Sequence, residues 1–545
     1  MLGDSTLTTY TDAERPQMGW GERIGLHFDS THVKIKNWAA GGRSSRSFYY
    51  ESTMWPAAKA AIKAGDYVII QFGHNDQKYG DTTSTGPYST YGTYAICSDP
   101  TITDGEACTG GTDIVDATTT RDEHSYYQML KRYVTQIQAL GAYPILATPM
   151  VRREVTSGVV TASGQHDYSA VIKGTEANPR GNYPAAVKAV GAKYNVPVLD
   201  ITADTKAIVE VFGSTPAADA LYMAADNTHP QIMYASLIAK RAADDIKAIA
   251  SLSALGNYVI AAPTIQANAY PVAFGPVTVG EASIKSLGVS AFDLSPAAGT
   301  LTVTAPSEVQ LSADQTTWSQ TLSLAYTGGA LTKVVYARFT PTLAKAYSAS
   351  IVVTSGSTTA ATVAFSGTGS AAPTDYVSWF SAGTATSPLI TGRLSAAAVT
   401  PVGLTAPTTT DTVTWSVNGV VVTPARYISD TWIAPDATKY LQFSVTPTVA
   451  LNITNISMYF ASYGGSNLRA NLEYSLSADF SNPVRLNDVD LTTSKEILTQ
   501  AKYTISVPVS AGATLYVRVF PWQKTATTAT KGIALYSVTV GGVTP

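Results

Sequence analysis

Residues 67–76 read YVIIQFGHND, an apolar run that passes directly into four small or polar residues. Such a run is typical of a strand buried on both faces, as in the parallel sheets of α/β proteins. In those sheets, ligands bind outside the carboxyl ends of the strands. We therefore predict a strand over 67–73 and a functional loop at Gly73–Asp76.

The first 250 residues repeat this pattern. Further strands are predicted over 32–38, 143–149 and 196–201. Apolar and small residues at helical spacing predict helices over 55–64, 123–140 and 184–194. Strands that alternate with helices are typical of a parallel, doubly wound sheet. The sequence therefore predicts an α/β domain over 1–252.

Two further motifs supply the parts of a serine hydrolase. The chain reads Gly3-Asp4-Ser5-Thr6 at its start and Asp226-Asn227-Thr228-His229 near the end of the α/β region. A serine hydroxyl becomes an effective nucleophile when a base accepts its proton. We predict Ser5 as the nucleophile and His229 as the base. Asp226 lies three residues before His229, so a short turn brings its carboxylate to one imidazole nitrogen and fixes the tautomer.

The sequence also offers hydrogen-bond donors for an oxyanion. They are the backbone N–H groups of Ser5 and Gly42 and the side-chain amide of Asn75. One such donor stabilises a transition state by roughly 3–4 kcal/mol. Glycine at 42 lets the backbone approach closely. A helix beginning just after Ser5 would add its positive end near the developing charge.

The order of these motifs resembles that of the SGNH (GDSL-type) hydrolases. Three stretches are similar to signatures of the rhamnogalacturonan acetylesterase branch of that family, namely Gly3-Asp4-Ser5-Thr6, Asn37…Gly42-Arg43-Ser44…Arg46-Ser47-Phe48 and Thr148-Pro149-Met150-Val151-Arg152-Arg153. The likeness covers residues 1–250. It implies a flavodoxin-like, three-layer α/β/α fold and a serine esterase that needs no metal or other cofactor. Its block residues match Ser5, Gly42, Asn75 and His229, with Asp226 as the third member of the triad.

This resemblance implies a serine carbohydrate esterase that removes O-acetyl groups from plant cell-wall polysaccharide, foremost pectic rhamnogalacturonan. Two alternatives remain at this point: an esterase for another acetylated glycan such as xylan, and a catalytically silent glycan-binding scaffold. A metallophosphoesterase would need an Asp-x-His pair together with further histidines as metal ligands, and we find no such set.

After residue 253 the helical pattern stops. Residues 264–370 form short alternating apolar runs separated by turn residues, which is typical of a β-sandwich and loosely resembles Ig-like modules. Residues 375–545 resemble the jelly-roll modules appended to bacterial polysaccharide esterases. The predicted domains are therefore 1–252, 264–370 and 375–545, the last a candidate carbohydrate-binding module.

Composition narrows the class of protein further. The net charge is −3 and only 14% of residues are charged, which does not fit a nucleic-acid binder. No apolar run is long enough to span a bilayer.

The two cysteines indicate where the protein is located. Cys97 and Cys108 lie close together in the sequence, so we predict that they form a disulfide in an oxidising compartment. We expect that an export signal and most of a first strand are missing before Met1. The expected location is therefore secreted, periplasmic or at the cell surface.

Other residues near the motifs admit two interpretations. A guanidinium pairs well with the carboxylate of an acidic sugar such as galacturonate, but it also forms structural salt bridges. The arginines concerned are Arg43, Arg46, Arg152 and Arg153. His74 and Asp76 are expected to brace the loop of Asn75. Residues 78–120 are expected to wall the mouth of the active site. The remaining histidines are expected to be solvated or structural: His27, His32, His124 and His166.

Overall fold

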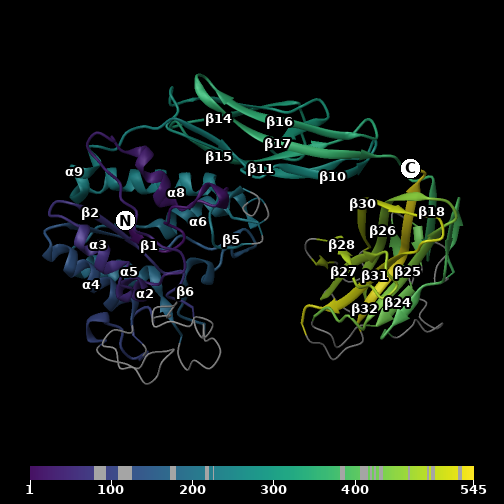
Figure 1. Cartoon of the computed structure of the whole chain (residues 1–545), viewed down its shortest axis with the longest axis horizontal. Helices are drawn as coiled ribbons and strands as arrows, with labels where there is room; N and C mark the ends of the chain where they lie inside the picture. Colours follow the sequence, from purple (N-terminus) through teal and green to yellow (C-terminus); the bar gives the residue numbers. More distant parts are fainter. Residues whose placement is uncertain are drawn as a thin grey trace. The chain divides into compact units, whose positions relative to one another are not determined.

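Figure 1 shows the computed structural model of the chain. It describes residues 1–78, 94–97, 99–108, 125–171, 179–214, 216, 220–224, 226–380, 387–404, 415–417, 420–422, 425–428, 434–463, 467–487, 490–492, 498–525 and 531–545. Most of the predicted wall of the site, residues 78–120, lies outside these ranges.

A parallel sheet forms the centre of the first part of the chain. Its strands lie in the order β1-β2-β3-β8. Their bounds are Leu2–Gly3 (β1), Tyr67–Gln71 (β2), Tyr143–Ala147 (β3) and Val198–Leu199 (β8). Leu2 pairs with Ile70, and Ile69 pairs with Ile145, in parallel register. The carboxyl ends of these strands therefore share one edge of the sheet.

Alternate side chains of the sheet pack into two separate cores, one on each face. Ile69 and Ile145 enter one core, whereas Val68, Ile70 and Leu146 enter the other. This period of two is the geometry of a strand buried on both faces. Figure 1 shows helices on both sides of the sheet. The first core includes α1 (Trp20–Arg23), α6 (Ile201–Phe212), α8 (Ile232–Ala248) and α9 (Ser253–Gly256). The second includes α2 (Ser45–Tyr50), α3 (Trp55–Ala61), α4 (Tyr126–Ala139) and α5 (Tyr183–Tyr194).

Short elements connect these helices and strands. Two small hairpins pair β4 (Val155–Thr156) with β5 (Val159–Val160) and β6 (Asp167–Tyr168) with β7 (Gly181–Asn182). The 3-10 helices are η1 (Asp12–Glu14), η2 (Ile24–His27), η3 (Gly105–Ala107), η4 (Ser163–Gln165) and η5 (Ala250–Leu252).

The predicted three-layer α/β arrangement is confirmed, and one predicted strand is wrong. β2, β3 and β8 fall within the predicted ranges, but residues 32–38 form no strand. That segment does lie beside β1, where Trp38 N–H donates to the Met1 carbonyl at 2.9 Å and Ala40 N–H to the Gly3 carbonyl at 3.0 Å. Because β1 contains only two residues, it offers too little edge for a regular ladder.

A β-sandwich follows the α/β part. One sheet has the strand order β10-β17-β16-β12-β14 and the other β13-β15-β11-β9. Phe339 of β15 lies 5.4 Å from Phe274 of β10 and 5.3 Å from Tyr347 of β16, between ring centroids, so aromatic side chains of both sheets meet in the core. The bounds are Thr264–Ala267 (β9), Val272–Thr278 (β10), Ser283–Phe292 (β11), Gly299–Thr304 (β12), Val309–Ser312 (β13), Thr321–Tyr326 (β14), Leu331–Phe339 (β15), Ala346–Ser355 (β16) and Thr358–Ser370 (β17).

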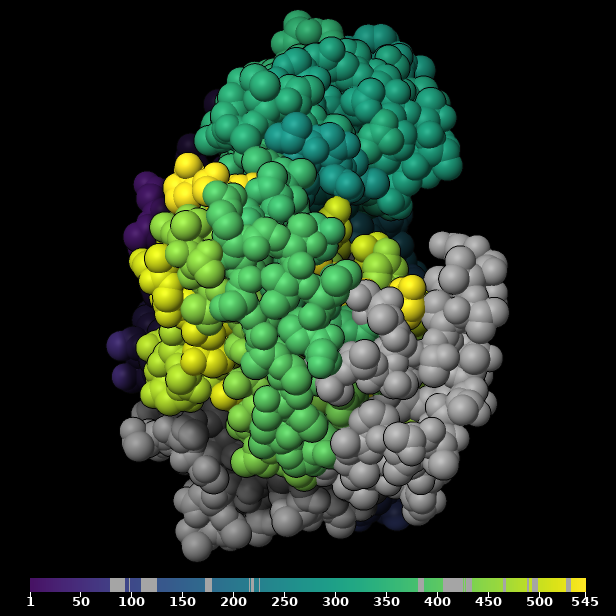
Figure 2. Space-filling view, turned by 90° about the vertical axis from the view of Figure 1, so that its right-hand side faces the viewer, coloured from purple at the N-terminus to yellow at the C-terminus, as the bar shows by residue number. Residues whose placement is uncertain are grey.

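The last part of the chain is a second, larger sandwich. One sheet runs β19-β18-β32-β26-β30 with β24 on β32, and the other runs β20-β25-β31-β27-β28 with β21 on β25 and β29 on β27. Both sheets contribute to one apolar core that includes Trp379 and Phe443, and Figure 2 shows the green-to-yellow residues as a closely packed body. The bounds are Asp375–Trp379 (β18), Leu389–Thr391 (β19), Leu394–Ala396 (β20), Thr400–Val402 (β21), Ala425–Ile428 (β24), Tyr440–Pro447 (β25), Leu451–Tyr463 (β26), Leu468–Ser475 (β27), Val484–Arg485 (β28), Leu491–Thr492 (β29), Thr499–Val509 (β30), Leu515–Gln523 (β31) and Gly532–Val543 (β32), with β22 (Trp415–Val417) and β23 (Val420–Val422) paired separately.

The predicted order of fold classes, an α/β domain and then β-sandwiches, is confirmed. The chain divides into two compact units, one of residues 1–272, 284–338 and 349–365, the other of 273–283, 339–348 and 366–545. Domain boundaries at 252, 264, 370 and 375 stay a prediction.

The predicted disulfide is present. Cys97 and Cys108 are joined, with their Cα atoms 5.5 Å apart. The bond closes a loop within the segment that follows β2.

Candidate active site

Ser5, His229 and Asp226 lie together at the carboxyl edge of the sheet. Ser5 Oγ is 3.0 Å from His229 Nε2, and His229 Nδ1 is 2.6 Å from Asp226 Oδ2. The carboxylate can only accept, so Nδ1 carries the proton and Nε2 presents its lone pair to the serine hydroxyl. This arrangement allows Nε2 to take the proton of Ser5 as the hydroxyl attacks.

The turn after β1 fixes the position of Ser5. Asp4 is fully buried, and its Oδ1 accepts from the backbone N–H of Thr6 at 2.9 Å and from the Thr6 hydroxyl at 2.8 Å. A Cβ on Gly3 would lie 2.5 Å from the Gln71 carbonyl oxygen, so glycine is what allows β1 to lie against β2 here. Burial acts to raise the pKa of Asp4, but His74 and the two Thr6 hydrogen bonds outweigh it and hold that pKa below its usual value.

The expected helix after Ser5 is absent from the described chain. Ser5 and Thr6 instead form a turn, in which Leu7 N–H donates to the Asp4 carbonyl at 3.2 Å. The side-chain hydrogen bonds of Asp4 stabilise this turn in competition with a helix.

Asp226 holds both the backbone and the ring of His229. Its Oδ1 accepts from the N–H groups of Thr228 at 2.6 Å and His229 at 3.1 Å, while Oδ2 accepts from the imidazole. Burial acts to raise the pKa of Asp226, but hydrogen bonds from His229 and Thr228 outweigh it and lower that pKa. The carboxylate is therefore ionised at neutral pH and available to stabilise an imidazolium.

Two of the three predicted oxyanion donors, Gly42 and Asn75, lie in two loops beside Ser5. Asn75 Nδ2 donates to the Arg43 carbonyl at 3.0 Å, which joins the loop after β2 to the loop of Gly41 and Gly42. A Cβ on Gly41 would lie 3.8 Å from Ser5 Cβ, so that loop runs directly past the serine. Gly42 has φ of +75° and open space around its Cβ position. The positive φ of Gly42 is a backbone conformation that favours glycine at this position.

Asp76 and His74 lie buried beside Asn75. The Asp76 carboxylate accepts from the backbone N–H and hydroxyl of Ser45, the first residue of α2. His74 Nδ1 lies 3.4 Å from Asp4 Oδ2, and burial lowers the pKa of His74. These contacts brace the loops around Ser5, as expected for both residues.

Comparisons with known proteins match the first part of the chain. Residues 1–231 match the model of the GDSL-like lipase/acylhydrolase family. The chain is 30% identical to the rhamnogalacturonan acetylesterase RhgT of Bacillus subtilis over 230 residues. The aligned residues make up 42% of this chain and 75% of RhgT. The chain belongs to the GDSL-like lipase/acylhydrolase family. It is a serine ester hydrolase.

A second relative and a solved structure were also found. The GDSL-like chain is 29% identical to the probable rhamnogalacturonan acetylesterase YesY of Bacillus subtilis, over 37% of this chain and 68% of that one. The chain is also similar to the YxiM protein of Bacillus subtilis, whose crystal structure is known. The sequence identity is 23%, the alignment covers 45% of this chain and 55% of the YxiM chain, and the TM-score is 0.32.

The four arginines of interest in this GDSL-like chain have different surroundings. Arg43 donates to Glu51 through two nitrogens, at 2.9 and 2.8 Å. Arg46 is 1% exposed. Arg152 is hydrogen-bonded to both loops of the candidate site. Arg153 is partly exposed and has no hydrogen-bonded or ion-paired side-chain partner among the described residues.

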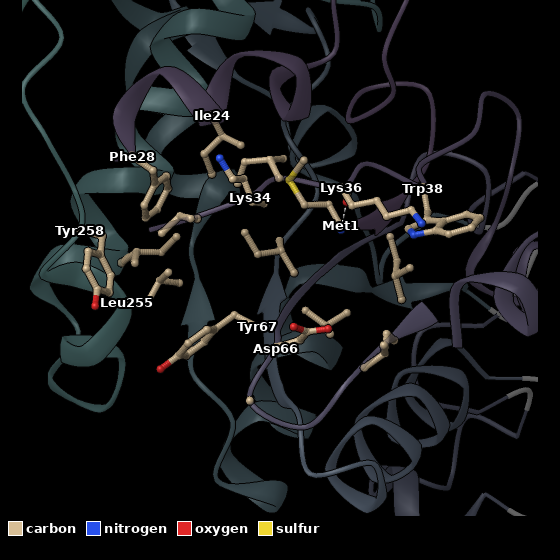
Figure 3. Close-up of a pocket in the computed structure, with 18 of the residues that line it drawn as sticks. Met1, Ile24, Phe28, Lys34, Lys36, Trp38, Asp66, Tyr67, Leu255 and Tyr258 are labelled. Atoms are coloured by element: carbon tan, nitrogen blue, oxygen red, sulfur yellow. Dashed lines mark hydrogen bonds between the residues drawn. The ribbon is translucent and has the colours of Figure 1, made fainter. Parts of the chain in front are cut away.

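A cavity of about 470 Å³ lies elsewhere in the GDSL-like domain. Figure 3 shows Met1, Lys34, Trp38 and Tyr67 among its lining residues, with the Met1 ammonium donating to the Lys36 carbonyl at 2.7 Å. The cavity adjoins the amino ends of β1 and β2, whereas Ser5 and Asn75 follow the carboxyl ends of those strands. It is not the candidate active site.

The described residues hold neither a metal-binding cluster nor a membrane-spanning helix. No group of three His, Cys, Asp or Glu side chains there is arranged to hold a metal ion. Likewise, within those ranges no helix is long and apolar enough to cross a membrane.

Proposed function

We propose that this chain, a carbohydrate acetylesterase, removes O-acetyl groups from pectic rhamnogalacturonan. The observation that carries the choice of polysaccharide is the match to two relatives named as rhamnogalacturonan acetylesterases, at 30% and 29% identity. The arrangement of Ser5, His229 and Asp226 supports the choice of chemistry.

In the proposed mechanism, Ser5 Oγ attacks the acetyl carbonyl carbon while His229 Nε2 takes the hydroxyl proton. Collapse of the tetrahedral intermediate breaks the bond to the sugar oxygen, which receives the proton from His229. Water then attacks the acetyl-Ser5 ester with His229 again as base, releasing acetate and restoring the serine. Asp226 stabilises the imidazolium in both steps.

The negative charge on the former carbonyl oxygen is proposed to meet three donors. They are the backbone N–H groups of Ser5 and Gly42 and the second N–H of the Asn75 amide. Its first N–H is bound to the Arg43 carbonyl, so the amide is held in place before the substrate arrives. Preorganised donors of this kind act on the transition state without a further reorganisation cost.

We propose that Arg153 contacts a galacturonate carboxylate of the polysaccharide. Its backbone N–H donates to the Asn227 carbonyl at 2.8 Å, which places the residue directly beside the catalytic turn. Arg153→Gln should raise KM for acetylated rhamnogalacturonan by about 10- to 100-fold, the range for losing a charged hydrogen bond. Steady-state acetate release measures this change. The control substrate is p-nitrophenyl acetate, which has no carboxylate, and an unchanged KM for the polysaccharide would contradict the assignment.

The proposed substrate is tested with matched acetylated polymers. We expect the highest kcat/KM for acetate release from acetylated rhamnogalacturonan, compared with acetylated homogalacturonan and acetylated xylan. A preference for xylan would favour the alternative glycan. Failure to hydrolyse any of these polymers or p-nitrophenyl acetate would favour a catalytically silent scaffold.

We further propose domains over 1–252, 264–370 and 375–545, and a secreted, periplasmic or cell-surface location. The Cys97–Cys108 disulfide supports an oxidising compartment. The third domain is proposed to bind glycan. If its removal leaves the affinity for polysaccharide unchanged, that role is wrong.

A further inference from the structure

One guanidinium joins the two loops that carry the proposed catalytic groups. Arg152 Nη2 donates to the His74 carbonyl at 3.1 Å, and Arg152 Nη1 donates to the Thr228 hydroxyl. His74 directly precedes Asn75, and Thr228 lies between Asp226 and His229. Arg152 therefore bridges the loop of the oxyanion donor and the turn of the base.

A buried histidine determines how this guanidinium is held. His166 is fully buried, and its Nε2 lies 2.6 Å from the Met150 carbonyl oxygen. That oxygen can only accept, so Nε2 carries the proton. Burial also lowers the pKa of His166 well below its usual value, so the ring is neutral. Nδ1 is therefore an acceptor that needs a donor.

Gln77 supplies that donor, and the other end of its amide orients Arg152. With its amide nitrogen toward His166, Gln77 Nε2 donates to Nδ1 at 2.7 Å. Its Oε1 then accepts from Arg152 Nη2 at 2.7 Å and from Nε at 2.8 Å. In the opposite orientation the amide oxygen would face the Nδ1 lone pair, which is a contact between two acceptors. The NH₂ group would then face the guanidinium, which is a contact between two donors. The tautomer of His166 thus fixes the amide, and the amide fixes the plane of Arg152.

We infer that Arg152, oriented by Gln77 and His166, is a positioning residue that holds the Asn75 loop and the His229 turn at their working separation. This inference rests on the proposed triad and oxyanion donors. Ser5 takes no part in the hydrogen bonds of Arg152 to His74 and Thr228. Its attack needs both the Asn75 loop and the His229 turn, so it succeeds only when both are in place around the serine. A displacement of about 1 Å at such a site can lower the rate about 100-fold.

Arg152→Lys is the first test. An ammonium is a point donor and cannot make the planar set of bonds to Gln77, His74 and Thr228. We expect kcat for p-nitrophenyl acetate to fall by up to about 100-fold while KM is unchanged. The downfield proton NMR signal of the His229–Asp226 hydrogen bond should broaden or shift. The matched control is Arg23→Lys, an arginine of the same domain whose Nε donates to Ser236 Oγ at 3.0 Å, and it should keep the wild-type kcat.

Thr228 provides an independent test at the other end of the bridge. Thr228→Val keeps the size of the side chain but removes the acceptor for Arg152, so kcat should fall as in Arg152→Lys. Thr228→Ser restores a hydroxyl and should recover most of that loss. Gln77→Glu keeps an acceptor for Arg152 but offers no proton to His166 when ionised, so it should also lower kcat. Melting temperatures of all variants separate loss of fold from loss of position.

Specific results would overturn the inference. Wild-type kcat in both Arg152→Lys and Thr228→Val would show that the bridge does not position the loops. Equal losses in Thr228→Val and Thr228→Ser would show that the hydroxyl is not what matters. A full rate in Ser5→Ala would instead refute the proposed nucleophile, so the two failures are distinguishable.

Discussion

Replacement of Ser5 by alanine should lower kcat for p-nitrophenyl acetate by about 10⁵-fold or more, because no other group can form the acetyl-enzyme. The fold should survive this change. The Ser5 hydroxyl makes one hydrogen bond, to His229. The Ser5 backbone carbonyl accepts from the Tyr10 hydroxyl at 2.8 Å, and the substitution leaves that bond unchanged. We expect the free energy of unfolding to change by only about 1 kcal/mol.

Acetate release and covalent labelling measure this prediction. A serine-directed phosphonate should label the wild type at Ser5 and leave Ser5→Ala unlabelled, and a thermal melt should show that the variant is folded. Wild-type turnover should also persist in EDTA, which separates the serine mechanism from a metal-dependent one. Unchanged turnover in a folded Ser5→Ala variant would remove Ser5 from the mechanism.

Short motifs made the members of the candidate site predictable. Asp226 and His229 are three residues apart, so their contact depends on one turn and can be predicted locally. Ser5 and Asn75 both follow buried strands, and the parallel sheet brings the ends of those strands to one edge. The sequence therefore contained enough information to select the residues that the structure brings together.

The bridge at Arg152 was not predictable in the same way. Gln77 and His166 are 89 residues apart, and neither belongs to a motif with a recognisable spacing. His166 was expected to be solvated or structural, and only its burial and the Met150 carbonyl define its tautomer. A guanidinium pairs well with carboxylates, so the sequence allows Arg152 to bind an acidic sugar, and it does not show that the hydrogen bonds of Arg152 are used inside the protein. Partners of buried polar groups are set by tertiary packing, which periodicity does not report.

The wrong strand at 32–38 has a related cause. The prediction rests on the residues of the segment alone, whereas a strand also needs a partner with sufficient edge. β1 contains only Leu2 and Gly3, so few backbone hydrogen bonds join the segment to it. At Gly42 the structure adds a feature that the sequence pattern does not report, a φ of +75° that favours glycine.

Replacement of Asp226 by asparagine should lower kcat by about 10⁴-fold, the loss typical of a triad whose histidine is held in the wrong tautomer. Asp226 Oδ1 accepts from the N–H groups of Thr228 and His229, so the amide oxygen of asparagine will occupy that place. The NH₂ group then faces His229 Nδ1, and two donors cannot share that contact. The ring responds by moving its proton to Nε2, where it can no longer accept the proton of Ser5.

This substitution separates geometry from proton placement, since the variant retains the backbone bonds of the turn. The KM for p-nitrophenyl acetate and the melting temperature should change little, and the downfield Nδ1 proton signal should disappear. Asp226→Ala should lose the rate and also destabilise the turn, because both backbone N–H groups then lack an acceptor. Wild-type kcat in Asp226→Asn would mean that the carboxylate does not set the tautomer of His229, and Asp226 would then be only a structural part of the turn.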